Sequence, residues 1–516
     1  MKEEIKEEKE DKAENKEKKL KKEKIKVWLK DPYNLAFLII LLFAFSLRLY
    51  YFFLTRNQPL WWDEAEYMLK AKNIAFNTPD TGWWYGRPIL FPLISAFFFK
   101  LGFNEVGIRF LFVLISTLNV FFIYTIGKIL FNKRVGLISS LLISFSYIDL
   151  FYTNRLLVNL PEIFFSLFVY FLFLETEFYN KSKKLIYFIF PLIIIGTLIR
   201  FTIGLIVIIL FFYFIFTNHF KFFKIREWYI SIFLGILLFL PYAIYSYIKY
   251  NNPFYVIISV LIGSTKDRAI GDTPIKVFID YIKYLPNYTN ILLFIFFLIG
   301  FFLLLLEIIL GFDKIKESKK LKKYLWLFLA FIIPLIYFGF FVNHFEDRYL
   351  AIALPCIFIL TSKGIENTYS FIKKYLGKFF SILIILAILL FGIYQMYNHS
   401  NEIIRIKLNS YQDLKFAGLW IKENSNPDDI IISTAIPQIT YYSERATYNF
   451  PENESKFLSF LEEKKPKYMI LSIWEKSPPW AYVWPENNSD KVRIIQVYFL
   501  DKEKKQVSTI IYEIIY

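Results

Sequence analysis

Two adjacent carboxylates follow the first strongly apolar stretch of the chain, in the segment QPLWWDEAEYM. Asp63 and Glu64 come directly after two tryptophans, a side chain that gathers at membrane–water interfaces. A carboxylate placed there could take a proton from a hydroxyl group. The same residues also fit a structural role: Asp63 with Glu66 has the spacing of a capping box for a helix over 64–75 that lies on the membrane surface.

Arginines recur in the links between other apolar stretches. Arg87 follows Tyr85 in WWYGRPILFPL, and an arginine in such a place either binds an anion or extends to lipid headgroups. Further candidates for binding a phosphate are Arg155, Arg200 and Arg348, and acidic or acceptor-binding candidates near them are Glu162, His344 and Asp347. A site that holds a phosphate while a carboxylate takes a proton needs this combination of charges, which favours a site at one membrane surface.

The elements that must position these residues are membrane spans. Of the 516 residues 56% are hydrophobic and 21% are aromatic, too apolar a composition for a soluble protein of this length. Apolar runs long enough to cross a bilayer predict about eleven transmembrane helices. The predicted spans are 34–54, 106–130, 135–152, 160–175, 185–199, 201–217, 229–248, 289–310, 325–342, 349–362 and 379–397.

Charge distribution predicts the topology of these spans. If the stretch 185–217 is two spans separated at Arg200, the lysine-rich loops 313–323 and 363–378 fall on the same side as the charged N-terminal tail. We therefore expect a multi-pass protein of the cell membrane with a cytoplasmic N-terminus. The predicted units are a charged cytoplasmic tail (1–30), a transmembrane catalytic domain (31–397) and an extracytoplasmic α/β domain (398–516).

The C-terminal unit carries strand-like runs in DDIIIST, KYMILSIW, RIIQVYFL and VSTIIYEIIY. Between them YQDLKFAGLWIKEN and ESKFLSFLEEKK have the apolar spacing of amphipathic helices. The single cysteine, Cys356, excludes an intrachain disulfide and a cysteine-based metal cluster. Metal dependence stays open, because Glu64, Glu162 and Asp347 could either ligate a divalent ion or pair with arginine. No nucleic-acid partner is expected.

The ordered series from the acidic pair through Tyr85, Arg87 and Pro88 to RYLAIALP resembles the GT-C membrane glycosyltransferases. Within them it resembles the branch of the dolichyl-phosphate-mannose protein mannosyltransferases and the aminoarabinose transferases. The resemblance implies a polyprenyl (dolichyl) phosphate-sugar donor and transfer of a hexosyl or pentosyl group, with inversion, to an acceptor hydroxyl at the outer face. Oligosaccharyltransferases of the same superfamily have a similar WWD motif, but in their soluble domain, so we expect transfer of one sugar.

The resemblance also implies roles for individual residues. Asp63 would be the base and Glu64 its support, Tyr85 and Arg87 would hold the lipid phosphate, and Arg155, Arg200 and Arg348 would stabilise the leaving phosphate. The family often has an acid near the proline after the third span, where this sequence has Asn159-Leu160-Pro161-Glu162, so Glu162 is the residue that could replace it.

A lipid-linked sugar flippase or a transporter is the alternative function. A transporter is expected to place polar residues at mid-bilayer and often has repeated halves, whereas here the charges gather at one surface and the sequence shows no repeat. The expected partners of the transferase are the polyprenyl phosphate-linked donor, membrane lipid and an acceptor that is a glycan, a lipid or a protein.

Overall fold

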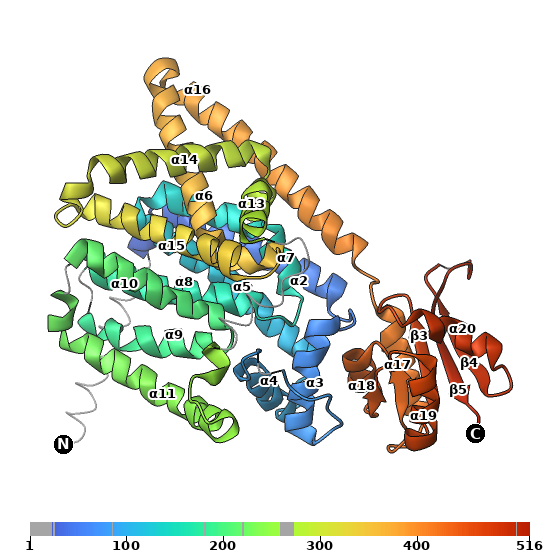
Figure 1. Ribbon diagram of the computed structural model, residues 1–516. Helices are drawn as coiled ribbons and strands as arrows, with labels where there is room; N and C mark the ends of the chain where they lie inside the picture. Colours follow the sequence, from blue (N-terminus) through green and yellow to red (C-terminus); the bar gives the residue numbers. More distant parts are fainter. Residues whose placement is uncertain are drawn as a thin grey trace, which may run out of the picture.

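The computed structural model describes residues 23, 26–84, 86–179, 182–218, 221–258, 273–501 and 503–516. The chain forms a large helical body and a smaller α/β unit built from the C-terminal segment (Figure 1). Most of the predicted tail 1–30 and part of the predicted outer segment 251–288 lie outside the described residues.

Seven helical segments in the described part of the chain are long and apolar enough to cross a membrane. An eighth is obtained if α6 (Lys133–Ser144) and α7 (Tyr147–Thr153), which meet at 52°, form one span. The long helices are α2 (Pro32–Thr55), α5 (Glu105–Leu130), α8 (Asn159–Tyr179), α11 (Arg226–Tyr250), α14 (Ile291–Leu310), α15 (Lys319–Phe341) and α16 (Leu354–Ile406), the last preceded by the 3-10 helix η6 (Asp347–Ala353).

Shorter helices fill the links: α3 (Trp62–Phe76), α4 (Leu90–Lys100), η1 (Lys183–Phe188), α9 (Ile189–Thr197), η2 (Phe201–Gly204), α10 (Leu205–Asn218), η3 (Lys221–Lys224), α13 (Pro274–Tyr284), η4 (Leu285–Tyr288) and η5 (Phe312–Lys314). The predicted interruption at Arg200 is confirmed, because α9 ends before it and its own backbone is extended, with φ −149° and ψ 122°. The number of spans stays a prediction.

Helix α16 is two helices in one segment. Gly377 has φ 73° and ψ 177°, a conformation open to glycine because it has no Cβ, and the chain reverses there (Figure 1). The predicted spans 349–362 and 379–397 thus fall on separate limbs. The first limb packs closely on α14, where a Cβ added to Gly364 would overlap the carbonyl oxygen of Phe296. Small residues at such a crossing allow backbones in a membrane to approach.

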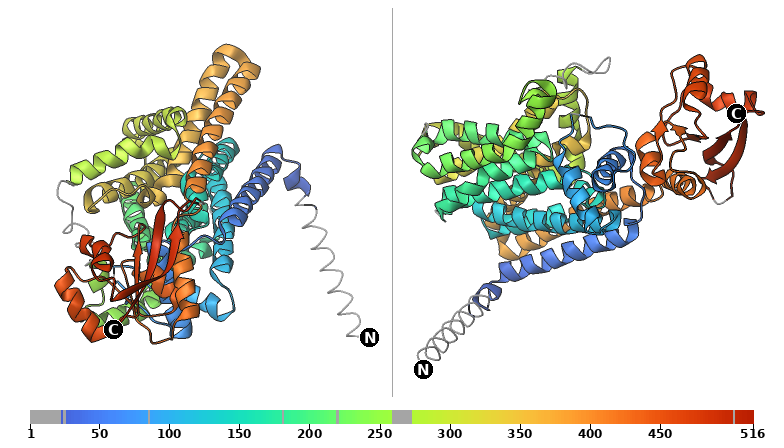
Figure 2. Two further views of the ribbon diagram at one scale, coloured as in Figure 1. Left: turned by 90° about the vertical axis from the view of Figure 1, so that its right-hand side faces the viewer. Right: turned by 90° about the horizontal axis from the view of Figure 1, so that it is seen from below.

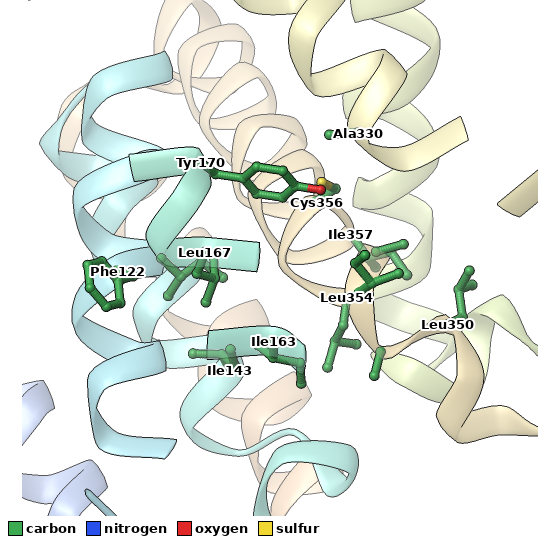
Figure 3. Packing of buried hydrophobic residues seen from close by; sticks show 14 of the residues in the cluster. Phe122, Ile143, Ile163, Leu167, Tyr170, Ala330, Leu350, Leu354, Cys356 and Ile357 are labelled. Atoms are coloured by element: carbon green, nitrogen blue, oxygen red, sulfur yellow. The ribbon is translucent and has the colours of Figure 1, made fainter. Parts of the chain in front are cut away.

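One apolar core joins the helices of the body. Figure 3 shows Tyr170 on α8 reaching toward Cys356 on α16, with Leu167 and Ile143 nearby. Cys356 is 1% exposed, as expected for a small apolar residue within a helix. The cluster extends to Leu350 of η6, so the segment that carries Arg348 is anchored to the core.

The C-terminal unit is a five-stranded sheet of order β2-β1-β3-β5-β4. Its strands are β1 (Ile431–Ser433), β2 (Thr447–Tyr448), β3 (Tyr468–Ser472), β4 (Val492–Phe499) and β5 (Val507–Ile514), and its helices are α17 (Gln412–Asn424), α18 (Ile436–Ser443), α19 (Glu454–Lys464) and α20 (Pro479–Asn487). β1 is parallel to both its neighbours, while β5 is antiparallel to both of its own. The predicted strands and helices are confirmed; α18, β2 and α20 were not predicted, because they are short and have little periodicity.

The C-terminal unit docks against α3 (Figure 1 and Figure 2). The Leu60 amide donates to the Tyr442 hydroxyl at 2.9 Å, just before α3 begins. Along α3, the Lys72 ammonium donates to the Tyr441 carbonyl at 3.1 Å and pairs with Glu444 at 2.6 Å. The unit therefore supports the helix that carries the two adjacent carboxylates.

Candidate active site

The start of α3 decides which of the two adjacent carboxylates caps the helix and which one does not. The structural alternative for Asp63, a capping box with Glu66, is not what the structure shows: α3 begins at Trp62, and the Trp61 amide donates to Glu64 Oε2 at 3.0 Å. A glutamate at the third position of a helix can reach back to the residue before it, which a shorter aspartate at the second position cannot do. Glu64 therefore satisfies the helix end, and Asp63 is available to other partners.

Asp63 lines a cavity of about 490 Å³, referred to below as the Asp63 cavity. Its walls come from segments far apart in the sequence: the start of α3, the loop before α4, the start of α8, the interruption at Arg200, the end of α15 and η6. The polar and charged lining residues are Asp63, Tyr67, Arg87, Asn159, Arg200, Thr202, Tyr337, Asn343, His344, Glu346, Arg348 and Tyr349. Apolar residues such as Val158, Ile199 and Phe338 complete it.

Asp63 is held between two arginines. Arg87 Nη2 donates to Asp63 Oδ1 at 2.6 Å, and Arg348 Nη2 donates to Asp63 Oδ2 at 2.9 Å. Each arginine has a second carboxylate, Glu66 for Arg87 and Glu346 for Arg348. The Asp63 side chain is 28% exposed, so this alternating row of charges is open to the cavity.

Burial shapes the properties of Arg87 and Tyr67. Burial lowers the pKa of the Arg87 guanidinium, although Asp63 beside it acts in the opposite direction. The guanidinium lies 5.5 Å from the centre of the Tyr67 ring, within the range of a cation–π contact. Burial raises the pKa of Tyr67, so its phenol is neutral at physiological pH. Arg87 is thus fixed as a cation at the cavity wall.

Arg200 enters the cavity from another side. Its guanidinium pairs with Glu162 at 3.0 Å and lies 5.5 Å from the Tyr349 ring centre. Glu162 is fully buried and also accepts from the Thr202 hydroxyl, so it is behind Arg200 and does not line the cavity. The structure gives Glu162 the position of a support for Arg200.

Glu64 and Arg155 form a separate buried pair beside the cavity. Arg155 Nη1 donates to Glu64 Oε2 at 3.0 Å, and the Leu156 amide donates to Glu64 Oε1 at 2.7 Å. The Arg155 guanidinium lies 3.5 Å from the centre of the Trp61 ring. Burial lowers the pKa of Arg155 to about 10, which still leaves it charged at neutral pH. This pair ties the first turn of α3 to the link between α7 and α8.

The last two candidates face different ways. His344 lines the Asp63 cavity, with Nε2 3.2 Å from Glu346. Asp347 accepts from the hydroxyls of Tyr147 at 2.8 Å and Tyr284 at 3.3 Å, outside the lining of the cavity. Tyr85 lies outside the described residues, so its predicted role stays a prediction.

The structure thus brings Asp63, Arg87, Arg200, Arg348 and His344 to one cavity and leaves Glu64, Arg155, Glu162 and Asp347 beside it. Sequence reasoning did not assign Glu66, Tyr67, Glu346 or Tyr349 to the site. Glu66 and Tyr67 lie about one helical turn from Asp63, and Glu346 and Tyr349 lie within two residues of Arg348. Proximity to predicted site residues was the only signal for them.

The three carboxylates considered as metal ligands do not meet. Glu64 pairs with Arg155, Glu162 with Arg200, and Asp347 with tyrosine hydroxyls. Within the described ranges no group of three or more His, Cys, Asp or Glu side chains has an arrangement suited to a metal ion.

Residues 86–245 match the family model described as dolichyl-phosphate-mannose-protein mannosyltransferase. That stretch contains Arg87, Arg155, Glu162 and Arg200 but neither Asp63 nor Arg348. No curated protein gives a significant match in sequence.

Two solved structures share the fold over most of this chain. The archaeal oligosaccharyltransferase AglB from Archaeoglobus fulgidus, in complex with an inhibitory peptide and a dolichol-phosphate, has a TM-score of 0.62 at 15% identity. The match covers 93% of this chain and 74% of AglB. ArnT from Cupriavidus metallidurans bound to undecaprenyl phosphate has a TM-score of 0.60 at 11% identity, over 92% of this chain and 97% of ArnT. The predicted resemblance to GT-C membrane glycosyltransferases is confirmed.

Proposed function

We propose that the protein is a glycosyltransferase that moves one sugar from a polyprenyl phosphate carrier to an acceptor hydroxyl, with inversion, at the outer membrane face. The observation that carries this proposal is Asp63 held between Arg87 and Arg348 in a cavity that Arg200 also enters. The similarity to a structure with dolichol-phosphate and to one with undecaprenyl phosphate supports a polyprenyl carrier. The transmembrane domain 31–397 and the outer domain 398–516 are part of the proposal.

The arginines would bind the donor phosphate. Guanidinium groups match phosphate oxygens in geometry, and each offers five N–H donors, so Arg87 and Arg348 can contact a phosphate while keeping a carboxylate partner. Glu66, Glu346 and Glu162 hold the three arginines in place before the donor arrives. Such prior placement is what electrostatic stabilisation of a transition state requires.

The reaction would break the bond between the anomeric carbon and the phosphate oxygen. The negative charge that develops on the departing polyprenyl phosphate would be stabilised by Arg87, Arg200 and Arg348. The acceptor oxygen attacks the opposite face of the anomeric carbon, which gives inversion, and its proton passes to Asp63 as general base. With a phosphate as leaving group, positioning and charge stabilisation account for most of the catalysis.

Glu64 would act through Asp63. It fixes the turn at Trp61 and is itself fixed by Arg155, so we assign the pair to positioning the base. Both are buried and outside the cavity lining, which separates them from a donor bound there. Tyr85 is retained as a phosphate-binding candidate on the family resemblance.

Purified protein in lipid vesicles, supplied with labelled polyprenyl phosphate monosaccharides, tests the proposal by release of labelled sugar. Asp63→Asn and Arg87→Ala should abolish or strongly reduce release without preventing insertion. Asp80→Asn is a matched control, because Asp80 pairs with Lys70 at 2.5 Å and does not line the cavity. Wild-type protein that carries the labelled lipid across the bilayer without releasing sugar would support the flippase alternative instead.

A further inference from the structure

A second cavity lies at the opposite end of the helical body from the Asp63 cavity. Its volume is about 410 Å³, and it is formed by α2, α6 and both limbs of α16. Its lining residues are Tyr33, Arg134, Leu137, Ile138, Ile365, Glu366, Tyr369, Lys378, Ile382, Ile385, Leu386 and Leu389. We call it the amphipathic groove, because its charged residues are at one end and its apolar residues follow along the helices.

The position of the groove follows from the helices that it shares with the site. The first limb of α16 starts directly after η6, which carries Arg348, and reaches the groove at 365–369. Helix α6 begins at the groove with Arg134, and α7 after it leads to Arg155 beside the site. The groove and the Asp63 cavity are therefore at opposite ends of the same spans.

The charged end of the groove is prepared for an anion. Arg134 Nε donates to the Tyr33 hydroxyl at 3.0 Å, and its guanidinium lies 5.6 Å from the Tyr369 ring centre. Two aromatic residues thus orient the guanidinium while it stays exposed. Lys378 adds a second exposed cation from the other limb of α16.

The one carboxylate in the lining is already engaged. Glu366 pairs with Lys363 at 2.8 Å and accepts a hydrogen bond from Asn132, neither of which lines the groove. Its single charge is shared with Lys363 and is outnumbered by those of Arg134 and Lys378. The charged end keeps a positive excess, which complements an anion and not a zwitterionic or cationic headgroup.

The apolar end has the properties of a surface covered by an acyl chain. Ile382 and Leu386 are 46% and 50% exposed and lie one turn apart, with Ile385 and Leu389 deeper in the wall. The chain reverses at Gly377, between the two limbs (Figure 1), and the exposed Ile382 and Leu386 belong to the second limb. A soluble anion would fill only the charged end, whereas a lipid of matching charge fills both.

We propose that the amphipathic groove binds one anionic glycerophospholipid, with its phosphate between Arg134 and Lys378 and an acyl chain along 382–389. This site is separate from the proposed transfer reaction and does not depend on it. Its occupant would contact α2, α6 and the two limbs of α16, which all contribute lining residues.

The experiment uses full-length protein in phosphatidylcholine vesicles that contain a trace of phosphatidylglycerol with a photoactivatable group in one acyl chain. After illumination, labelled peptides are mapped by mass spectrometry. We expect labelling within 382–389 that exceeds labelling by the matching photoactivatable phosphatidylcholine. Because each basic residue near an anionic lipid contributes to binding, Arg134→Gln should reduce the excess about fivefold, and Arg134→Gln with Lys378→Gln about thirtyfold.

Lys374→Gln is the matched control, since Lys374 is a cation near Gly377 that does not line the groove, and it should leave labelling unchanged. If the double variant does not fold, the labelling of Lys378→Gln alone still tests the proposal, because this exposed side chain has no part in the core. Equal labelling by the two lipids would overturn the proposal, because it would mean that the groove contacts lipids without selecting an anionic headgroup. Labelling that does not change in Lys378→Gln and Arg134→Gln would overturn it for the same reason. Millimolar inorganic phosphate, added at constant ionic strength, should not change the labelling. If it abolishes the labelling, the charged end binds a soluble anion and the lipid proposal is wrong.

Discussion

Replacing Glu64 by glutamine separates positioning from catalysis at the site. Glu64 is fully buried and accepts hydrogen bonds from Arg155, the Leu156 amide and the Trp61 amide, and it also pairs with the buried Arg109 at 4.0 Å. A glutamine can still accept some of these hydrogen bonds but removes the charge that compensates Arg155. With a pKa lowered to about 10, Arg155 stays protonated at pH 7, so the substitution leaves a buried cation without its partner.

The magnitude follows from the burial of both partners. Removal of one member of a buried ion pair costs about 3–5 kcal/mol of stability, because the other charge stays desolvated. Glu66→Gln is the control: Glu66 also pairs with an arginine, but its side chain is 27% exposed, and a partly exposed pair is worth about 1 kcal/mol or less. Exchanging Arg155 as well, in Glu64→Gln with Arg155→Met, should recover part of the loss, because Arg109 loses Glu64 but keeps Glu105 at 4.0 Å.

The assay measures the midpoint of unfolding in mixed micelles together with sugar release per folded molecule. Glu64→Gln should lower the midpoint clearly, and Asp63→Asn should leave it near that of wild type while abolishing sugar release. A Glu64→Gln protein with the wild-type midpoint and no turnover would refute the positioning role and place Glu64 in the chemistry. If the Glu64→Gln protein has both the wild-type midpoint and wild-type activity, the Glu64 charge is not needed to compensate Arg155.

Two further predictions concern the rest of the fold. Gly364→Ala should destabilise the helical body by about 2 kcal/mol or more, because the new Cβ meets the Phe296 carbonyl in a crossing that cannot separate freely. The unfolding midpoint checks it against Gly204→Ala, whose new Cβ would meet only the Thr197 side chain, at an ordinary contact distance of 3.7 Å. Burial raises the pKa of Glu444, but Lys422 and Lys72 outweigh it and the pKa is lowered, so its contribution to docking is complete above the ordinary glutamate range and is lost as pH falls through the lowered pKa. The unfolding midpoints of wild type and Glu444→Gln should differ slightly at pH 7 and converge only at a pH below the ordinary glutamate range.

The long apolar helices and the strands of the C-terminal unit could be predicted, because each leaves a strong local pattern. Sequence reasoning also found the interruption at Arg200, from the length of the apolar stretch and the distribution of charges, and α9 and α10 confirm that break. It did not find α18, which supports α3, since eight residues with a proline near the start show little periodicity. The capping role of Glu64 was also missed, because Asp63 and Glu66 fit the same motif two residues later in the chain.

The sequence by itself determined that this chain has many apolar helices, a C-terminal α/β unit and a set of arginines and carboxylates between the apolar runs. Only the tertiary structure decided which of these charges meet. Asp63 and Glu64 are adjacent in the chain, yet one faces Arg87 and Arg348 in a cavity and the other is buried against Arg155. Successive helical residues point about 100° apart, so neighbours in sequence enter different environments, and long-range packing supplies their partners.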